Sequence, residues 1–282
     1  MILQKEIREK SLDWEVPPDT VEKDYVLGHF LAGFCSCFKD ELIFKGGTCL
    51  RKCYFPGYRF SEDLDFSSIN HDFKIEDKHL HEICKQIESH SGLLFLPEVI
   101  DELQHKNIKK GYQVRIRYWG ANHSKNQAPL PTSRWLTKIK LEVSTEEICL
   151  LEAVNKPIHH PYSDQLINDD PIPCYDLNEI IAEKLRSLVQ RSYKAPRDYY
   201  DLYMLTCKLD NEQWKFIKEL FLQKMDHKSI QYEGPGQLVN EINQMQVRRA
   251  WNASIAHQLS SKTTITPDEM IYKVGFLIRE NL

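Results

Sequence analysis

The sequence predicts an α+β protein: a mixed β-sheet core with flanking helices, followed by a helical C-terminal domain. Two segments, 112–119 and 137–144, alternate between apolar and polar residues, as strands with one buried face do. Beyond about residue 175, apolar residues instead recur at helical spacing. A loop-rich stretch with four prolines, 155–175, separates the two patterns. We therefore expect two domains, 1–170 and 171–282.

Composition excludes several classes of protein. Of the 282 residues, 41% are hydrophobic and 28% charged, which is typical of a water-soluble globular chain. The net charge of −4 argues against a generally basic nucleic-acid coat, although it allows a local basic groove. No apolar run is long enough to span a membrane, and the N-terminus lacks a signal-peptide pattern, so we expect a cytoplasmic protein. The spacing of the eight cysteines matches no zinc-site pattern, and we expect reduced thiols.

The strongest motif lies between residues 42 and 67. A short apolar strand leads into Gly46-Gly47, a short helix is expected from Thr48 to residue 54, and a second strand carries Asp63 and Asp65. Side chains at positions i and i+2 of a strand share a face, so the two carboxylates point at one spot. Two such charges repel unless a cation lies between them, and oxygen ligands favour Mg²⁺ or Mn²⁺.

The glycines supply a second function to this motif. Glycine lets the backbone approach a phosphate closely, and the helix N-terminus offers N–H groups to an anion. A Gly-Gly pair alone is common, and an Asp-x-Asp alone is usually a solvated loop, but their order and strand-like flanks together favour a functional site. On the polar face of 137–144, Glu142 is a candidate third metal ligand or general base. The alternative is a salt-bridged polar surface.

The first helix is expected over residues 21–34, with Glu22, Lys23 and Asp24 as its solvated first turn. Residues 1–19 are mixed in character, and Pro17-Pro18 is expected to break any early helix.

Two charges interrupt apolar helix faces in the second half of the chain. Lys184 falls within the apolar arc of a helix over 176–192, and Asp198 falls in the middle of the inner face of the next helix, 197–209. A buried ammonium needs an anion. The alternatives are snorkelling at the edge of the arc, an internal Lys184–Asp198 salt bridge, or a shared role with the paired aspartates in one catalytic cleft.

Other charges of these helices receive simpler interpretations. Glu179 is expected to form a capping-box variant with Asp176, whereas Glu183, Arg186 and Gln190 look like ordinary surface. Basic side chains near the helix end and on the first alternating strand are candidates for an RNA-backbone surface, although solvated positions are an equal alternative. These are Arg115, Arg117, Arg191, Lys194 and Arg197.

From about residue 21 to residue 205 the chain resembles the AbiEii / type IV toxin nucleotidyltransferase family. The segments that carry the resemblance are Glu22-Lys23-Asp24, Lys45-Gly46-Gly47-Thr48-Cys49-Leu50, Arg59-Phe60-Ser61-Glu62-Asp63-Leu64-Asp65-Phe66, Leu141-Glu142-Val143-Ser144, Glu183-Lys184-Leu185 and Arg197-Asp198-Tyr199-Tyr200-Asp201-Leu202.

The resemblance implies a fold, a reaction and partners. The fold is a nucleotidyltransferase-like sheet core. The protein would be the toxin of a bacterial toxin–antitoxin or phage-defence system, with a cognate antitoxin encoded nearby. It would transfer a nucleotide from an NTP, with Mg²⁺ or Mn²⁺, to an RNA acceptor, expected to be the 3′ end of tRNA.

The resemblance also assigns roles to individual residues. Asp63 and Asp65 would bind metal, joined by Glu142 where the family often has Asp, and Lys184 and Asp198 would complete the catalytic set. The nucleotide would be held by Lys45, Gly46, Gly47, Thr48, Ser61 and Lys184. Two other readings stay open: transfer to a protein hydroxyl, as in AMPylation or a kinase-like reaction, and a non-catalytic nucleotide-binding module.

Overall fold

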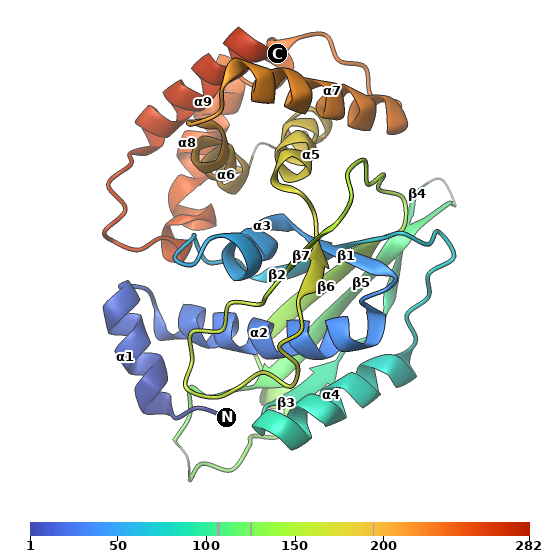
Figure 1. Ribbon diagram of the computed structural model, residues 1–282. Helices are drawn as coiled ribbons and strands as arrows, with labels where there is room; N and C mark the ends of the chain where they lie inside the picture. The colour runs from blue at the N-terminus through green and yellow to red at the C-terminus, as the bar shows by residue number, and fades with distance from the viewer. Residues whose placement is uncertain (106–107, 125, 194) are drawn as a thin grey trace. The chain divides into compact units, whose positions relative to one another are not determined.

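A mixed β-sheet forms the core of the first half of the protein (Figure 1). The computed structural model describes residues 1–105, 108–124, 126–193 and 195–282. Within them, the strand order is β3-β5-β6-β2-β1-β8-β7, and β4 pairs with β5. The strands are β1 (Leu42–Lys45), β2 (Asp63–Ser68), β3 (Leu94–Pro97), β4 (Asp101–His105), β5 (Ile108–Trp119), β6 (Lys138–Ser144), β7 (Val154–Lys156) and β8 (Ile172–Cys174).

Helices flank the sheet and make up most of the C-terminal part. In the first half they are α1 (Gln4–Trp14), α2 (Pro18–Phe38), α3 (Gly46–Cys49), the π-helical turn η1 (Leu50–Tyr54) and α4 (Asp77–Ser91). In the second half they are α5 (Leu177–Gln190), α6 (Pro196–Thr206), α7 (Asn211–His227), α8 (Glu241–Ser254) and α9 (Pro267–Asn281). Short 3₁₀ turns η2 (Thr132–Arg134), η3 (Pro235–Gln237) and η4 (Ala256–Gln258) lie in the connections. The predicted α+β class is confirmed.

The chain forms two compact units. Unit 1 comprises residues 1–147 and 153–174, and unit 2 comprises 148–152 and 175–282. The five-residue segment belongs to the helices of unit 2 because Glu179 on α5 accepts hydrogen bonds from the backbone N–H groups of Leu150 (2.8 Å) and Leu151 (2.9 Å). Lys224 on α7 donates to the carbonyl of Ile148 (2.8 Å) and pairs with Glu179 (2.7 Å).

The two alternating segments form the neighbouring strands β5 and β6, as their patterns predict. Their apolar side chains are buried on one face, where α2 and α4 lie (Figure 1). On β2, Phe66 packs in tilted ring contacts against Phe34 of α2, with 5.1 Å between ring centroids, and against Phe44 of β1, with 5.0 Å. This burial fixes the register, so the polar residues of these strands share the opposite face.

An early helix, α1, does form over Gln4–Trp14, and it ends before the two prolines. Its one fully buried side chain, Ile7, anchors it, and Glu15 ends it in the left-handed conformation. Pro17-Pro18 then starts α2 instead of breaking a helix, because proline at the first helical position lacks only an N–H that would have no partner there.

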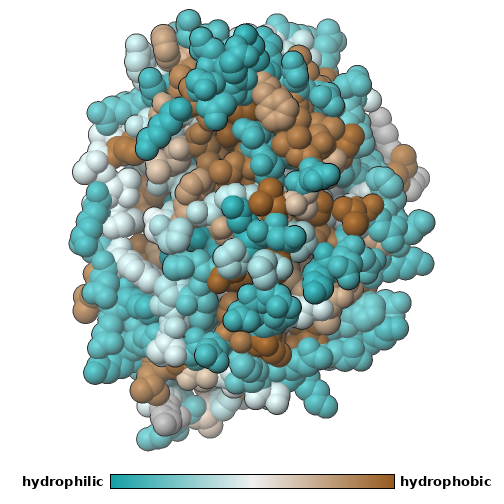
Figure 2. All heavy atoms as spheres, in the orientation of Figure 1, coloured by the Kyte–Doolittle hydropathy of each residue, from teal (hydrophilic) through white to brown (hydrophobic). Residues whose placement is uncertain are grey.

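No helix of the described ranges is long and apolar enough to cross a membrane. The face drawn in Figure 2 is largely hydrophilic, with hydrophobic side chains in smaller areas between the polar ones.

Candidate active site

Four charged side chains form what we call the acidic face: Asp63 and Asp65 on β2, and Lys140 and Glu142 on β6. The two strands are parallel neighbours, with Asp63 opposite Lys140 and Asp65 opposite Glu142. Because directly paired residues point to the same side of a sheet, the three carboxylates and the ammonium lie on one surface. The residues between them, Leu64 and Leu141, are buried on the other side.

Negative charge exceeds positive charge within the acidic face. Lys140 Nζ lies 3.2 Å from Glu142 Oε2 and 3.8 Å from Asp63 Oδ2. Burial, together with repulsion from Asp63 and Glu142, raises the pKa of Asp65 to about 6. Repulsion therefore disfavours the ionised form of Asp65, and a bound cation would relieve this repulsion.

Gly46 and Gly47 form a tight turn against the acidic face. Gly46 has φ of +80°, and a Cβ there would lie 2.5 Å from Asp65 Oδ2. A Cβ on Gly47 would lie 2.7 Å from Nη2 of Arg59 and 3.0 Å from Oγ of Ser61. Gly46 therefore requires glycine for its backbone conformation, and a side chain at Gly47 would displace the guanidinium of Arg59.

The rest of the predicted nucleotide-binding motif lies beside this turn. Lys45 is the strand partner of Asp65, and the hydroxyl of Thr48 donates to the backbone carbonyl of Asp63 at 2.5 Å. Strand end, glycine turn, helix start and carboxylates are thus one local structure, in which Ser61 adjoins Gly47.

The side chains of this structure fit a hard divalent cation in chemistry, since Asp63, Asp65 and Glu142 offer only oxygen ligands. Among the described residues, however, the groups whose ligand atoms all lie within 4.8 Å of one another do not include these three carboxylates. Repulsion keeps like charges apart, which agrees with the raised pKa of Asp65.

Basic residues continue the same sheet face beyond the acidic residues. On β5, Arg115 stands opposite Lys140, and Arg117 stands opposite Lys138. Arg115 is exposed, whereas Arg117 pairs with Glu98 at 2.7 Å. A strip of positive charge therefore adjoins the carboxylates on the same surface.

In unit 2, Lys184 is nearly buried and bridges two aspartates of α6, forming the Lys184 cluster. Its Nζ lies 3.2 Å from Asp198 Oδ1 and 2.5 Å from Asp201 Oδ2. Arg191 Nη1 lies 2.8 Å from Asp198 Oδ2. The predicted Lys184–Asp198 salt bridge is confirmed, and the cluster's two positive charges balance its two negative ones.

The remaining predicted RNA contacts are less defined. Arg191 has a half-exposed side chain engaged with Asp198, and Arg197 is half-buried on α6. Lys194 lies outside the described residues.

Comparison with known proteins identifies the chain. The profile of the family described as "Nucleotidyl transferase AbiEii toxin, Type IV TA system" matches residues 29–271. The chain belongs to this family. It is therefore a nucleotidyltransferase of the toxin–antitoxin (TA) type, and the family implies an NTP substrate and a cognate antitoxin.

One solved structure supports the fold. The chain is similar to the MenT4 nucleotidyltransferase toxin of Mycobacterium tuberculosis H37Rv, at 20% identity and a TM-score of 0.60, over 100% of this chain and 91% of that one. An antigenic nucleotidyltransferase-like protein from Paracoccidioides brasiliensis matches at 15% identity over 74% of this chain and 91% of that one, but its TM-score of 0.33 is too low to indicate a shared fold. A search of curated protein sequences finds no match.

Within this AbiEii-family chain, the prediction that Glu22 and Asp24 are solvated is wrong. Asp24 is buried and binds Arg51 Nε (2.6 Å), Lys52 Nζ (2.7 Å) and the hydroxyl of Tyr162 (2.8 Å). Burial alone would raise the pKa of Asp24, but the two cations hold it well below its usual range. This network ties α2 to η1, directly behind the glycine turn.

Glu22 is buried on the same helix for a different reason. Its Oε1 accepts from the backbone N–H of Asn122 at 2.6 Å, and a Cβ on Gly120 would lie only 2.5 Å from the same oxygen. Burial raises the pKa of Glu22 to about 7, so the carboxyl group is partly protonated at neutral pH. Lys23 does reach outward and pairs with Glu62 at 2.9 Å.

Two interpretations of α5 also need correction. Asp176 caps the helix by accepting from Asn178, whereas Glu179 is fully buried in the ion pair with Lys224. Arg186, which was expected at the surface, is buried. Its guanidinium contacts Glu183 and Gln190. The helical wheel missed Glu179 because its partners, residues 150–151 and Lys224, come from elsewhere in the chain.

Sequence reasoning also missed Lys140 as part of the acidic face. A signal existed, since strict alternation in residues 137–144 places Lys140 on the same side as Glu142. The pairing of β6 beside β2 was not evident, because 69 residues lie between the end of β2 at Ser68 and the start of β6 at Lys138, and a parallel pairing leaves no local turn signal.

Proposed function

We propose that this AbiEii-family toxin transfers a nucleotide from an NTP to the 3′ end of tRNA in a divalent-metal-dependent reaction in the cytoplasm. The observation that carries the proposal is the shared surface of β2, β5 and β6. On it, paired carboxylates stand beside a strip of arginine and lysine side chains. Such a strip suits a polyanionic acceptor whose end must reach the carboxylates.

The acidic face would hold the metal, with Asp63 and Asp65 as ligands and Glu142 as a third. When bound, the divalent ion would polarise the α-phosphate of the NTP. Ionised Asp65 is the form that binds it, so metal and proton compete for this carboxylate.

The glycine turn would hold the triphosphate. Gly46 and Gly47 keep the backbone close to the side chains of Asp65, Arg59 and Ser61, and without side chains of their own they would let a phosphate approach the backbone at this turn. Lys45 and Thr48 flank the turn. The acceptor hydroxyl then attacks the α-phosphorus, and pyrophosphate leaves.

Lys184 and Asp198 of unit 2 would complete the catalytic set. The ammonium of Lys184 would neutralise charge on the triphosphate during transfer. Because both oxygens of Asp198 already accept from Lys184 and Arg191, its role is to orient these cations and not to act as general base.

A transfer assay tests the proposal. The protein is incubated with each of four labelled NTPs, Mg²⁺ and total tRNA, with Asp65→Ala as the inactive control. We expect label on the tRNA with one or a few nucleotides, removable by 3′ exonuclease. Label on a protein from an added cell extract, with none on RNA, would favour the AMPylating alternative. No label on any acceptor would favour the non-catalytic module.

The part of Glu142 is tested separately. Glu142→Gln keeps the size of the side chain but removes its charge, so we expect about 10-fold lower activity and a higher Mg²⁺ concentration at half-maximal rate. An unchanged Mg²⁺ dependence would remove Glu142 from the ligand set. Glu88→Ala, at an exposed position of α4, is the matched control.

A further inference from the structure

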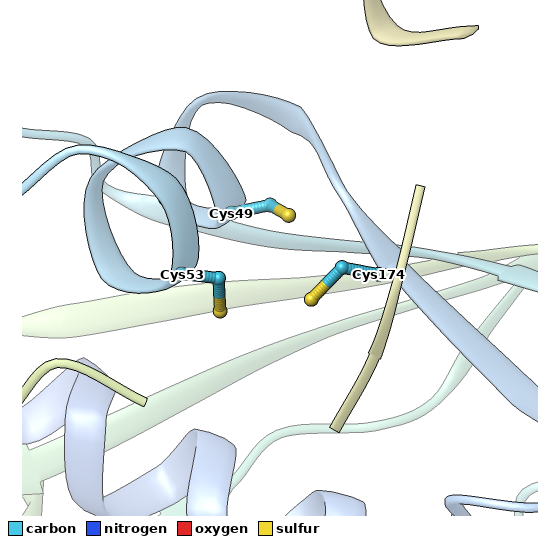
Figure 3. A group of neighbouring side chains, drawn as sticks. All are labelled: Cys49, Cys53 and Cys174. Atoms are coloured by element: carbon cyan, nitrogen blue, oxygen red, sulfur yellow. The ribbon is translucent and has the colours of Figure 1, made fainter. Parts of the chain in front are cut away.

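Three cysteines from distant parts of the sequence meet within unit 1. Cys49 ends α3, Cys53 lies one helical turn later in η1, and Cys174 ends β8 (Figure 3). Their sulfur atoms all lie within 4.8 Å of one another. Cys49 and Cys174 are buried, whereas Cys53 is partly accessible. We call these residues the thiol cluster.

The surroundings of the thiol cluster favour a thiolate at Cys53. The neighbouring thiols of Cys174 and Cys49, followed by the ammonium groups of Lys52 and Lys156, hold the pKa of Cys53 well below its usual range. Burial raises the pKa of Cys49. A partly accessible thiolate thus lies beside two protonated thiols. This arrangement is typical of redox-sensitive sites, in which the thiolate is oxidised first and a neighbouring resolving thiol then forms a disulfide with it.

Cys174 is better placed than Cys49 to form a disulfide with Cys53. Figure 3 shows the side chain of Cys174 directed from β8 toward Cys53. Cys49 and Cys53 lie four residues apart on one helical segment, where their Cα–Cβ bonds are nearly parallel and do not face each other.

We propose that the thiol cluster is a peroxide-sensitive modification site in which Cys53 is oxidised and Cys174 forms a disulfide with it. In the first step, the Cys53 thiolate attacks hydrogen peroxide, giving Cys53 sulfenic acid and hydroxide. In the second, the sulfur of Cys174 displaces the sulfenic oxygen, which leaves as water with the thiol proton. Peroxide is reduced by two electrons, and the two cysteines are oxidised by two.

A competition experiment tests the first step. The reduced full-length protein is treated at pH 6 with limiting iodoacetamide, and alkylation of each cysteine is followed by mass spectrometry. The internal control is Cys37, which is exposed and whose pKa is raised by burial and by Glu82. We expect Cys53 to be alkylated at least 10-fold faster than Cys37, although Cys37 is more accessible. Faster reaction at Cys37 would overturn the proposal.

Peptide mapping tests the second step. After treatment with hydrogen peroxide and blocking of free thiols, trypsin cleaves at Arg51 and Lys52 and so separates the Cys53 peptide from the Cys49 peptide. We expect the Cys53 peptide linked to the tryptic peptide of residues 141–184 at Cys174 and not at its other cysteine, Cys149, as fragmentation of the linked peptide shows, and reversal by dithiothreitol. Cys174→Ser should instead accumulate Cys53 sulfenic acid, trapped by dimedone, and Cys49→Ser should still form the link.

Two outcomes would contradict the thiol cluster as a redox site. One is a Cys53 that stays reduced under conditions that oxidise Cys37. The other is stoichiometric zinc in the purified protein that Cys53→Ser loses, which would make the cluster a metal site. Thermal melting of each variant shows that it is folded before its chemistry is compared.

Discussion

The acidic face, whose side chains are half-buried, and the nearly buried Lys184 cluster differ in whether their charges are compensated. On the acidic face, three carboxylates share the surface with Lys140, and the pKa of Asp65 is raised to about 6 by burial and repulsion. In the Lys184 cluster, two cations meet two aspartates at 2.5–3.2 Å. The first arrangement is unfavourable without an added cation. The second is already neutral, so its lysine is held in one orientation before any substrate arrives.

A charged side chain therefore has to be interpreted together with the groups that neutralise it. Excess charge indicates a site that a ligand completes, whereas compensated charge serves stability, positioning or both.

The largest effect is expected at the acidic face. Asp65→Ala should lower nucleotide transfer at least about 1,000-fold, because it removes a metal ligand. It should not lower the melting temperature, since it also removes a repelling charge. Activity and thermal melting are measured on the same preparation. A strongly destabilised variant would mean that Asp65 is structural, and the difference between the two sites would disappear.

Lys184→Met should have the opposite balance of effects. It leaves Asp201 buried without its ammonium, which we expect to cost about 3 kcal/mol in the free energy of unfolding, and should lower activity about 100-fold. Urea denaturation and the transfer assay measure the two.

The double variant Lys184→Met/Asp201→Asn separates positioning from stability, because it removes both charges of the 2.5 Å pair. It should regain most of the lost stability but not the activity. Recovery of both would show that Lys184 has only a structural role.

Without bound metal, protonation of Asp65 at lower pH should increase the free energy of unfolding of the protein. The pKa of Asp65 is higher in the folded protein (about 6) than in the unfolded chain, so between pH 4 and 6 the folded state binds more protons. Stability should therefore fall as pH rises through this window, by about 2 kcal/mol after allowance for partial solvent exposure. Asp65→Asn should lose this component, and Mg²⁺ should oppose it. An unchanged slope in Asp65→Asn would assign the effect to other groups.

The smallest effect is expected on the basic strip beside the acidic face. Arg115→Ala should weaken tRNA binding about 3-fold and reduce the slope of log affinity against log salt by about 1, because one phosphate contact is lost. Activity at saturating tRNA should not change. Filter binding at several salt concentrations measures this, with Arg8→Ala at an exposed position of α1 as control. The same tRNA affinity and salt dependence in both variants would show that tRNA does not contact Arg115.

The periodicity of apolar residues gave correct predictions where the burial of a side chain depends on nearby sequence positions. Strict alternation identified both faces of β5 and β6, and the helical wheel exposed Lys184 as a misplaced charge whose partner, Asp198, lies on the next helix. In each case the burial of a side chain could be predicted from residues a few positions away in the same helix or strand.

Long-range pairing accounts for what the sequence did not reveal. Asp24 looked like the first turn of a solvated helix because its partner Tyr162 lies 138 residues away. The strands β7 and β8 have only three residues each, and β8 joins the sheet by pairing with β7 and, through Cys174 opposite Phe44, with β1. No local pattern announces such contacts, and the thiol cluster stayed hidden for the same reason.

The excursion of residues 148–152 has a practical consequence for dissecting this protein. The backbone leaves unit 1 after residue 147, donates five residues to the helical unit, returns for 153–174 and leaves again. A fragment starting at residue 175 would therefore keep Glu179 and Lys224 but lose the peptide groups of Ile148, Leu150 and Leu151 that solvate this ion pair. Neither unit can be cut out as one uninterrupted stretch, so autonomous folding of each half would require a circularly permuted or grafted chain.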